Sequence, residues 1–411
     1  MAITIQVKRD TAANWTSNNP TLAAAEFGFE TDTGKLKLGD GSTAWSSLNY
    51  FEPAAAAAVT SNVQGSEFGY AAGGRSAPTT YQNEINKYSF TSDGNATDVG
   101  DLTTANYVQG PSSFSSPSHG YAAKQYAYPP YTVGNTIEKF PFASDTNATC
   151  IGDIEGGAGG RQGTAFDSTD AYIVINSNSS SIPATAAPFR IPGTGPTTYA
   201  QKIMKFPFAS DTYAHSGGWF AGIAPNCQCS GAVSSSTHGY ISTLNSNCFH
   251  PTGDGGEYWK FPFAISDAFA TCVGDILAPV CSGGNNPTLT EGRRDGGQIG
   301  YQSDSNGYFY QTDLYDVNTA IVKFPFASDA NATDVLALTC HPTSCKRGAV
   351  GSTSSTAGGY SHGGRRIDPT GPYFVADNTI DKFPFASDTN AADVGDLAYS
   401  AWDGLGSNLQ N

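Results

Sequence analysis

Aromatic side chains gather in several irregular segments of this chain. Three tyrosines fall within the eight residues 124–131, interrupted by two prolines. Such rings stack on the C–H faces of sugars while neighbouring Asn, Ser and Asp side chains bind hydroxyl groups, and tyrosine offers a large contact area at low entropic cost. We therefore predict partner binding by Tyr126, Tyr128, Tyr131, Trp219, Phe220, Phe249 and Tyr373. The alternative interpretation is that these rings pack the loops onto the domain.

Catalytic and metal-binding motifs are not found in the sequence. The histidines show neither His-x-His nor His-Glu-x-x-His spacing, and His119 and His238 precede the same Gly-Tyr pair, which indicates a structural role. Nucleophile elbows and phosphate-binding glycine loops are also missing. We predict no catalytic residue, no metal, no cofactor and no enzymatic activity. A recurring aspartate is interpreted as a turn residue: Asp93, Asp145, Asp211, Asp267, Asp329 and Asp388.

An internal repeat must position these segments. The sequence Lys-Tyr-Ser-Phe-Thr-Ser-Asp at residue 87 returns as Lys-Phe-Pro-Phe-Ala-Ser-Asp at residue 139, and again at Lys205, Lys260, Lys323 and Lys382. A Gly-Tyr pair or its relative precedes each copy, and most copies are followed by a motif such as Val-Gly-Asp-Leu. A stretch of small residues precedes the Gly-Tyr pair. Each repeat unit therefore predicts four strands.

The repeat predicts an all-β fold, a six-bladed β-propeller of four-stranded antiparallel blades. Phenylalanines at i and i+2 point to one side of a strand, where a neighbouring blade would bury them. The predicted blade core is Phe140, Phe142, Phe206, Phe208, Phe261, Phe263, Phe324, Phe326, Phe383 and Phe385. We expect a β-bulge at Pro141, and a hairpin after each third strand in which Asn adopts a positive φ.

The blade unit resembles the kelch family of propellers. The resemblance rests on Tyr-Ala-Ala-Gly-Gly-Arg at residues 70–75 and Tyr-Ser-His-Gly-Gly-Arg at residues 360–365. Residues 401–407 resemble the small-residue strand of a further unit and are expected to complete the first blade; a solenoid is the alternative arrangement. In such a meander the connections between second and third strands and between fourth and first strands emerge on one face. Their variable lengths make that face the predicted recognition surface.

Residues 1–52 lack the repeat and predict a small β-hairpin-rich domain, followed by a linker at 53–62 and the propeller at 63–411. Phe27-Gly-Phe29 faces Leu36-Lys-Leu38 across a turn, which gives a hairpin with one apolar face. Fifty residues without a disulfide or metal seldom form a sufficient core alone. We therefore expect this domain to be buried against copies of itself or a partner.

Several short motifs of this domain carry a second resemblance. They are Ile-Gln-Val-Lys-Arg at residue 5, Trp-Thr-Ser-Asn-Asn-Pro at residue 15, Gly-Phe-Glu-Thr-Asp-Thr-Gly at residue 28 and Leu-Gly-Asp-Gly at residue 38. Together they resemble the N-terminal domain of phage tail fibres and major tropism determinants. The resemblance implies a virion attachment module that forms a homotrimer and contacts other virion proteins.

Charge and hydropathy restrict the partners. The net charge of −15 argues against nucleic acid and against a bare anionic membrane. Apolar runs are too short for membrane insertion, and the first residues do not read as a secretion signal, so assembly into a virion in the host cytoplasm is expected. Sparse cysteines leave one or two disulfides undecided, around Cys227, Cys229 and Cys248 or between Cys340 and Cys345.

The sequence as a whole predicts a phage tail fibre or appendage whose propeller loops bind a host-surface glycan or protein. Two alternatives remain at this point. One is a capsid decoration or whisker protein without a receptor, and the other is a depolymerase of surface polysaccharide.

Overall fold

The chain divides into two compact units, Met1–Thr60 and Ser61–Asn411. The structure is a computed structural model. It describes residues 7–50, 63–77, 80–103, 113–123, 126–127, 132–133, 136–154, 163–177, 200–211, 215–219, 228–244, 256–264, 270–276, 299–312, 319–337, 347–348, 351–367, 374–401 and 406–410. Among these residues no helix is long and apolar enough to cross a membrane.

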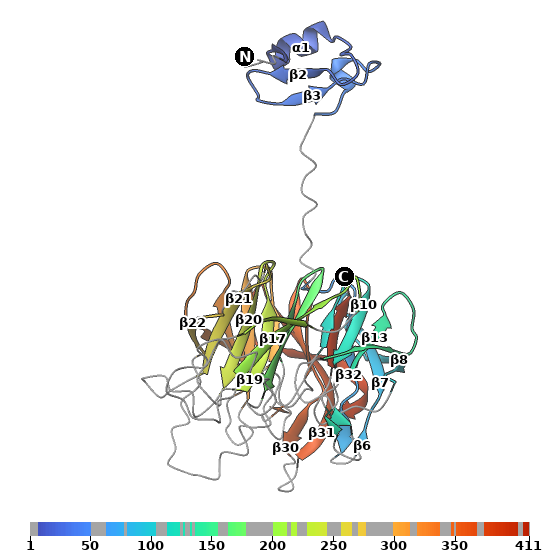
Figure 1. Cartoon of the computed structure of the whole chain (residues 1–411), viewed down its shortest axis with the longest axis vertical. Coiled ribbons are helices and arrows are strands. Elements are labelled where there is room, and N and C mark those ends of the chain that lie inside the picture. Colours follow the sequence, from blue (N-terminus) through green and yellow to red (C-terminus); the bar gives the residue numbers. More distant parts are fainter. Residues whose placement is uncertain are drawn as a thin grey trace. The chain divides into compact units, whose positions relative to one another are not determined.

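The first unit is a three-stranded sheet with one helix (Figure 1). Strand β1 (Lys8–Asp10) pairs in parallel with β2 (Phe27–Glu30), which pairs antiparallel with β3 (Leu36–Leu38), as the predicted hairpin requires. Helix α1 (Ala12–Asn18), which the sequence analysis did not predict, begins where the Thr11 side chain accepts a hydrogen bond from the Asn14 N–H. It ends at Asn19 in the left-handed conformation, and the short helix η1 (Trp45–Ser47) follows β3.

Two stacked indoles form the core of this unit. The rings of Trp15 and Trp45 lie 4.2 Å apart and nearly parallel, with Leu22 beside them. Gly28 on β2 makes this possible, because a Cβ there would lie 2.5 Å from the Trp45 ring. The core therefore covers one face of the sheet.

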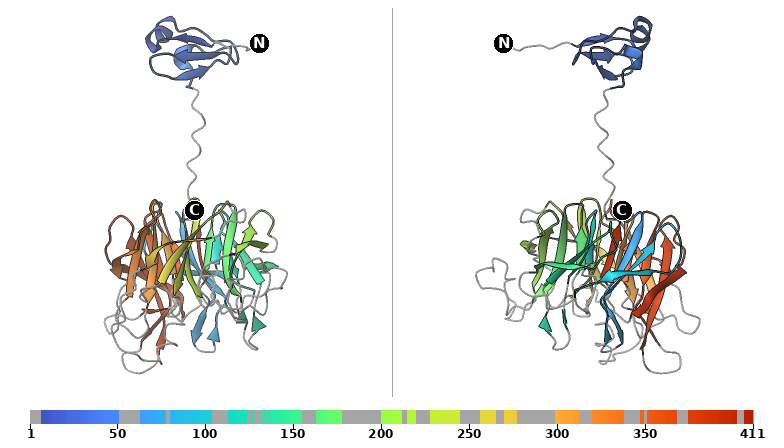
Figure 2. Two further views of the ribbon diagram at one scale, coloured as in Figure 1. Left: turned by 60° about the vertical axis from the view of Figure 1, so that its left-hand side comes forward. Right: turned by 90° about the vertical axis from the view of Figure 1, so that its right-hand side faces the viewer.

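The second unit consists of successive antiparallel blades (Figures 1 and 2). Each blade has four strands in the same order; the sheet of the last blade carries two additional strands, and two small two-stranded sheets lie beside the blades. From the inner to the outer strand, the first blade is β33 (Gly406–Gln410), β4 (Phe68–Ala72), β7 (Glu84–Ser89) and β8 (Thr97–Asp101); the second is β9 (Ser113–Ser115), β10 (His119–Ala123), β13 (Thr136–Pro141) and β14 (Thr149–Asp153); the third is β15 (Gly163–Phe166), β16 (Asp170–Ser177), β17 (Ala200–Pro207) and β18 (His215–Trp219).

The remaining blades follow the same pattern. The fourth is β19 (Gln228–Ser234), β20 (His238–Leu244), β21 (Gly256–Pro262) and β22 (Thr271–Ile276); the fifth is β23 (Ile299–Gln302), β24 (Asn306–Thr312), β25 (Thr319–Pro325) and β26 (Thr333–Ala337); the sixth is β28 (Gly351–Ser354), β29 (Gly358–His362), β31 (Phe374–Pro384) and β32 (Ala392–Ala401). The prediction of an all-β propeller of four-stranded antiparallel blades is thereby confirmed.

The inner strands form a closed ring. Strand β33 contacts β9, and contacts then run through β15, β19, β23 and β28 back to β33. The strand that contains the last described residues thus completes a blade whose other strands come from the beginning of the unit, as predicted. It is β33 (Gly406–Gln410) rather than residues 401–407, because Ala401 is the last residue of β32. Serines allow the inner strands to approach closely: the Ser115 Oγ accepts the Leu409 N–H at 2.9 Å, and the Ser234 Oγ accepts the Phe166 N–H at 2.9 Å.

The glycine of each Gly-Tyr pair is explained by a ring above it. Gly120 lies opposite Phe140 in the β10–β13 register, and a Cβ on Gly120 would lie 2.3 Å from that ring. Gly239 and Gly307 stand in the same relation to Phe261 and Phe324. The first phenylalanine of each motif therefore packs over the glycine of its own sheet and also contacts the preceding blade, as Phe140 contacts Tyr70 and Phe324 contacts Tyr240.

The bulge expected at Pro141 is not there. The β13–β14 register shifts between Ile137 and Glu138, so Ile151 on the outer strand is the extra residue. A register shift at the equivalent place recurs in the other blades, and in the first, fourth and sixth blades it also falls just before the Gly-Asp of the outer strand. Pro141 avoids the cost of its missing N–H because it is the last residue of β13, beyond the end of the β14 ladder at Lys139.

Candidate binding face and the junctions that hold it

Two kinds of connection lie at opposite ends of the blades. The first-to-second and third-to-fourth connections are short hairpins, such as residues 116–118 and 142–148; we call their end the hairpin face. The other end, where second strands lead to third strands and fourth strands to first strands, is called the loop face. Described strands extend there in the first and sixth blades: β5 (Arg75–Ala77) pairs with β6 (Thr80–Tyr81), and β30 (Arg365–Ile367) pairs with β31 and with β27 (Arg347–Gly348) (Figure 1).

The chain enters the propeller at the hairpin face. The Gly65 N–H donates to the Ser354 carbonyl at 2.7 Å, next to the hairpin between β28 and β29. The buried Gln64 side chain donates to the carbonyls of Gln302 and Ser355 at 3.0 and 3.1 Å. The segment that leads to the N-terminal unit therefore starts on the side of the ring away from the loop face.

Each blade reaches the next through a lysine. Its Nζ lies 5.5 to 5.9 Å above the tyrosine ring of the Gly-Tyr pair opposite it in the same blade. It also forms an ion pair with the aspartate of the following blade: Lys87–Asp145 at 3.1 Å, Lys139–Asp211 at 2.5 Å, Lys260–Asp329 at 3.3 Å, Lys323–Asp388 at 3.1 Å and Lys382–Asp93 at 3.0 Å. Lys205 pairs with Asp170 of its own blade, and the aspartate of the following blade at this junction, Asp267, lies outside the described residues. Partly exposed pairs contribute little energy each, so their main effect is to fix the orientation of the blades.

These ion pairs extend the interpretation of the repeated aspartates. Five of them stand in or beside hairpins, and their carboxylates also bind lysine across a junction; Asp267 lies outside the described residues. The expected positive φ of the hairpin asparagines is wrong, because Asn95, Asn147 and Asn331 do not adopt it. Their side-chain oxygens instead accept the N–H groups of Asp396, Asp101 and Asp275 of the preceding blade, each at 3.1 Å.

Aromatic stacking fills the same junctions. The tyrosine of each Gly-Tyr pair lies against the second aromatic ring of the following blade, with centroid distances of 5.0 Å for Tyr70–Phe142, 5.3 Å for Tyr121–Phe208, 4.7 Å for Tyr172–Phe263, 5.0 Å for Tyr240–Phe326, 5.0 Å for Tyr308–Phe385 and 4.8 Å for Tyr360–Phe90. Burial raises the pKa of Tyr121 and of Tyr240 to about 12, so both hydroxyls stay neutral.

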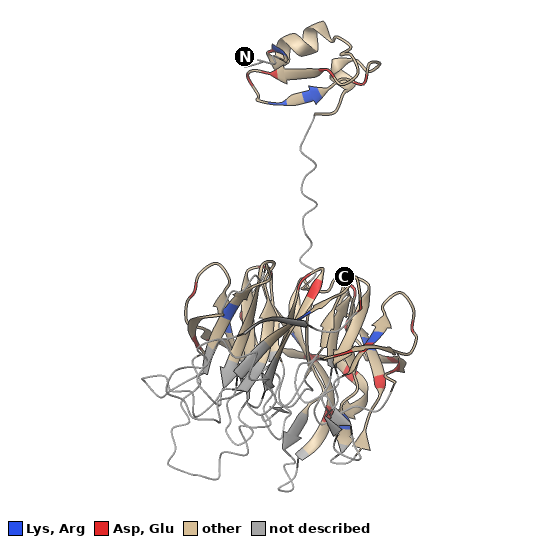
Figure 3. Cartoon of the chain, in the orientation of Figure 1, with Lys and Arg blue, Asp and Glu red and all other residues tan. Residues whose placement is uncertain are grey.

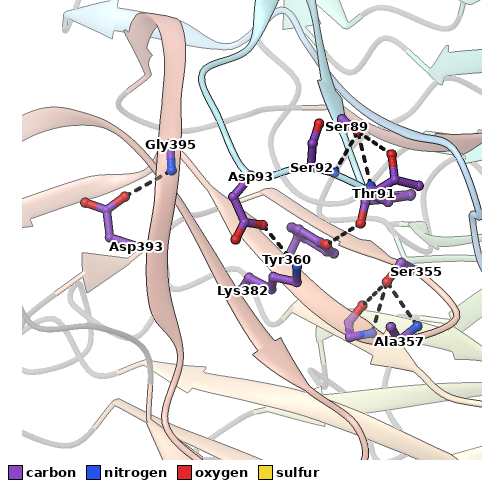
Figure 4. Close-up of polar contacts among 12 residues, drawn as sticks. Ser89, Thr91, Ser92, Asp93, Ser355, Ala357, Tyr360, Lys382, Asp393 and Gly395 are labelled. Carbon is purple, nitrogen blue, oxygen red and sulfur yellow. Dashed lines mark hydrogen bonds and ion pairs between the residues drawn. The ribbon is translucent and has the colours of Figure 1, made fainter.

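Figure 4 shows polar contacts at the junction between the sixth and first blades. Lys382 pairs with Asp93, and the Tyr360 hydroxyl donates to the Phe90 carbonyl at 3.3 Å. The Asn86 side-chain oxygen accepts the Ala398 N–H at 2.7 Å, and Glu138 accepts the Thr103 N–H at 2.8 Å in the equivalent place of the next junction. The repeat motifs thus join neighbouring blades and stabilise the closed ring. The ring in turn holds the loop face in a fixed position.

Most of the predicted blade core is fully buried. Phe140, Phe142, Phe206, Phe261, Phe263, Phe324 and Phe383 are buried, whereas Phe208, Phe326 and Phe385 are half-buried against the clusters that they border. The half-buried rings are second phenylalanines, which lie beyond the last residue of the third strand near the hairpin face.

The predicted binding residues are mostly outside the described part of the chain. Tyr128, Tyr131, Phe220, Phe249 and Tyr373 lie there. The backbone places Tyr126 in β11 (Tyr126–Ala127), which pairs with β12 (Thr132–Val133) in a hairpin on the second-to-third connection, and Trp219 at the end of β18. Both positions belong to the loop face, and the contribution of all seven residues stays a prediction.

Ionic and metal-binding groups on the described blades are sparse. Figure 3 shows Lys and Arg scattered over the described blades with Asp and Glu among them. No group of three His, Cys, Asp or Glu residues in the described part could hold a metal ion. Cys150 is an exposed free cysteine, while the cysteines considered for disulfides lie outside the described residues or, for Cys229, in a strand whose side chain is not described.

Two histidines on the hairpin face are expected to make the stability of the folded chain depend on pH. Burial lowers the pKa of His119 and of His238 below the usual 6.5, and Lys139 and Lys260 act in the same direction. The unfolded chain therefore binds more protons than the folded chain in mildly acidic solution. The stabilisation is present above about pH 6.5 and is lost as the pH falls through the folded-state pKa. Denaturant unfolding at about pH 7.5 and about pH 5 should show this loss, and H119N/H238N should reduce it; an unchanged difference would contradict the assignment.

The described residues define a β-propeller joined to a small N-terminal α/β unit, and comparison with known proteins places the latter. Residues 5–43 match the family model of the major tropism determinant N-terminal domain, which confirms the resemblance seen in the sequence. A curated protein named Hyaluronoglucosaminidase, from Streptococcus pyogenes phage H10403, is 45% identical over 49 residues. Those residues are 12% of this chain and 14% of that protein, so the match spans only about a seventh of the relative. The N-terminal residues of this chain are thus similar to a segment of a phage protein.

Solved structures of low identity resemble the propeller. YjhT is 9% identical with a TM-score of 0.42, covering 72% of this chain and 86% of that chain. The GH43_1 enzyme from Xanthomonas citri complexed with xylotriose is 12% identical with a TM-score of 0.38, covering 72% of this chain and 92% of that chain.

The prediction that the chain is not an enzyme is wrong. It is contradicted by the phage relative, which is named for an enzymatic activity. The prediction rested on missing local motifs. Catalytic groups on a repeat scaffold can come from separate blades, and such a set has no sequence spacing to detect.

Proposed function

We propose that this chain is a virion protein, a tail fibre or appendage, whose loop face binds a glycan on the host surface. The observation that carries the proposal is the position of Gln64 and Gly65, whose hydrogen bonds place the chain's entry on the hairpin face. The match of residues 5–43 to the tropism-determinant N-terminal domain supports a role of this chain in host recognition. A net charge of −15 favours a neutral glycan over anionic partners.

Binding to purified host-surface polysaccharide tests the proposal. Replacing Tyr126, Tyr128 and Tyr131 by serine should weaken binding about tenfold or more, because each lost ring removes stacking area. The matched control replaces the exposed Ser92, Ser144 and Ser387 of the hairpin face by alanine and should bind like the wild type. Equal loss in both variants, or no binding by the wild type, would contradict the proposal.

We also infer that the N-terminal unit forms a homotrimer through the sheet face opposite its indole core. Phe27 is opposite Leu38 and Phe29 is opposite Leu36 in the β2–β3 register, so all four lie on that face. Phe27 is 36% exposed and the neighbouring Val7 is 39% exposed, the large exposed apolar residues of the described chain. Burial of such a face against copies of itself adds apolar contact area to the small indole core of this unit.

Substitution of Phe27 by lysine should convert the trimer to a monomer, because it would place a charge in an apolar interface. Light scattering of the full chain measures the mass, and T16K on the exposed face of α1 is the control that should remain trimeric. A monomeric wild type, or a trimeric F27K variant, would contradict this interface.

The name of the phage relative favours a second candidate function, cleavage of a surface polysaccharide by the propeller. New reducing ends after incubation of the purified chain with host polysaccharide would establish it. Binding without new reducing ends would leave recognition as the function.

A further inference from the structure

Two residues that depart from the repeat meet at the junction between the sixth and first blades. Tyr88 stands where the other five copies have phenylalanine. His362, two residues after Tyr360, stands where the other blades have alanine, valine, serine or tyrosine. The Tyr88 hydroxyl lies 3.1 Å from the His362 Nδ1, and both side chains are buried, with exposed fractions of 3% and 0%. The two residues that depart from the repeat therefore contact each other.

The contact continues into a chain of hydrogen bonds. The Tyr88 hydroxyl also lies 2.5 Å from the Thr353 Oγ1, and the His362 Nε2 lies 3.2 Å from the Ser407 Oγ. The Ser407 Oγ accepts the Ser352 N–H at 2.9 Å, which leaves its own proton for the Nε2. The Nδ1–H then donates to Tyr88, and Tyr88 donates to Thr353. Burial raises the pKa of Tyr88, which keeps its hydroxyl protonated as a donor.

Space for this chain is provided by a glycine. A Cβ on Gly351 would lie 2.2 Å from the His362 Nε2 and 2.8 Å from the Ser407 Oγ. The hydrogen-bonded groups come from β7, from β28 and β29 of the sixth blade, and from β33. The network thus joins early and late parts of the propeller sequence at the place where the ring closes.

We propose that Tyr88, His362, Thr353 and Ser407 form a polar latch that fixes the register of the ring-closing strand β33. This strand has five residues, and a slip by one residue would exchange the sides to which Ser407, Asn408 and Leu409 point. Apolar packing of the kind used at the other junctions tolerates small displacements, whereas a buried network loses its hydrogen bonds and leaves groups unpaired. The latch therefore selects one docking position for β33. It does not depend on the ligand of the loop face.

Amide hydrogen exchange of the full chain tests the latch, because it reports the opening of individual strands. In Y88F and in S407A, exchange of residues 407–410 and of their β4 partners should rise about tenfold to one hundredfold, the effect of leaving one buried partner unpaired. Exchange in β15 and β19 should be unchanged. In the double variant Y88F/H362L, the rise in exchange should be smaller than the product of the rises in Y88F and in H362L. Once both residues are replaced, neither leaves a buried partner unpaired.

The matched control is S361A. Ser361 is also fully buried on β29, but its Oγ bonds the Tyr301 hydroxyl of the fifth blade. This variant should raise exchange in β23 and leave β33 as in the wild type. Unchanged exchange of β33 in Y88F and S407A, an equal rise in all inner strands, or multiplicative effects in the double variant would overturn the proposal.

Discussion

Replacing Phe324 by alanine is expected to destabilise the propeller by about 3–5 kcal/mol, the usual cost of removing a buried phenylalanine ring. The ring is fully buried, with centroids of Tyr258 at 4.3 Å, Phe309 at 5.3 Å and Tyr240 at 5.4 Å. It also covers Gly307 in its own blade, so its removal opens a cavity within the blade and at the junction with the fourth blade. Denaturant unfolding followed by tryptophan fluorescence measures the loss.

The control is F326A. Phe326 belongs to the same motif but is half-buried at the edge of the same cluster. Its removal should cost clearly less, since fewer contacts are lost and water can fill the space. Equal losses for the two variants would contradict the view that the first phenylalanine of each motif carries most of the packing energy.

Deletion of residues 406–411 is expected to cost about 5 kcal/mol or more, comparable to the total stability of many domains. It removes the inner strand of the first blade, including the buried Leu409 and Asn408. The Asn408 amide donates to the carbonyls of Phe114 and Tyr121 at 2.6 and 3.0 Å, so the second blade loses partners as well. The midpoint of thermal unfolding of the propeller should fall strongly in the truncated chain.

Removal of Asn411 alone is the control for this deletion and should leave the transition unchanged. A truncated protein that unfolds cooperatively at the wild-type temperature would show that ring closure by β33 contributes little. It would also remove the basis for a rigid loop face.

The blade architecture could be predicted because each copy of the repeat contains the sequence signals of all four strands of one blade. Four strand signals recur with each copy of the lysine motif, and small residues mark the inner strand, including the closing one. The contacts that each motif makes could not be predicted from the sequence of a single blade. The Asn147 side chain and the Asp145 carboxylate find partners in the preceding blade, and such contacts exist only after the ring has closed.

The same reason explains the errors. The position of the bulge at Ile151 depends on how the outer strand meets the next hairpin, so the proline was a misleading signal. Tyr88 and His362 are 274 residues apart and show in the sequence only as departures from the repeat. The predicted binding residues lie in segments without a repeat, where neither periodicity nor a motif restricts their arrangement.

Hydrogen exchange of the full chain with and without host-surface polysaccharide tests the central claim most directly. The account predicts protection on the loop face, at 75–82, 126–127, 132–133 and 365–367, with no change in the hairpins at 116–118 and 142–148. Protection confined to the hairpin face or to the N-terminal unit would contradict it.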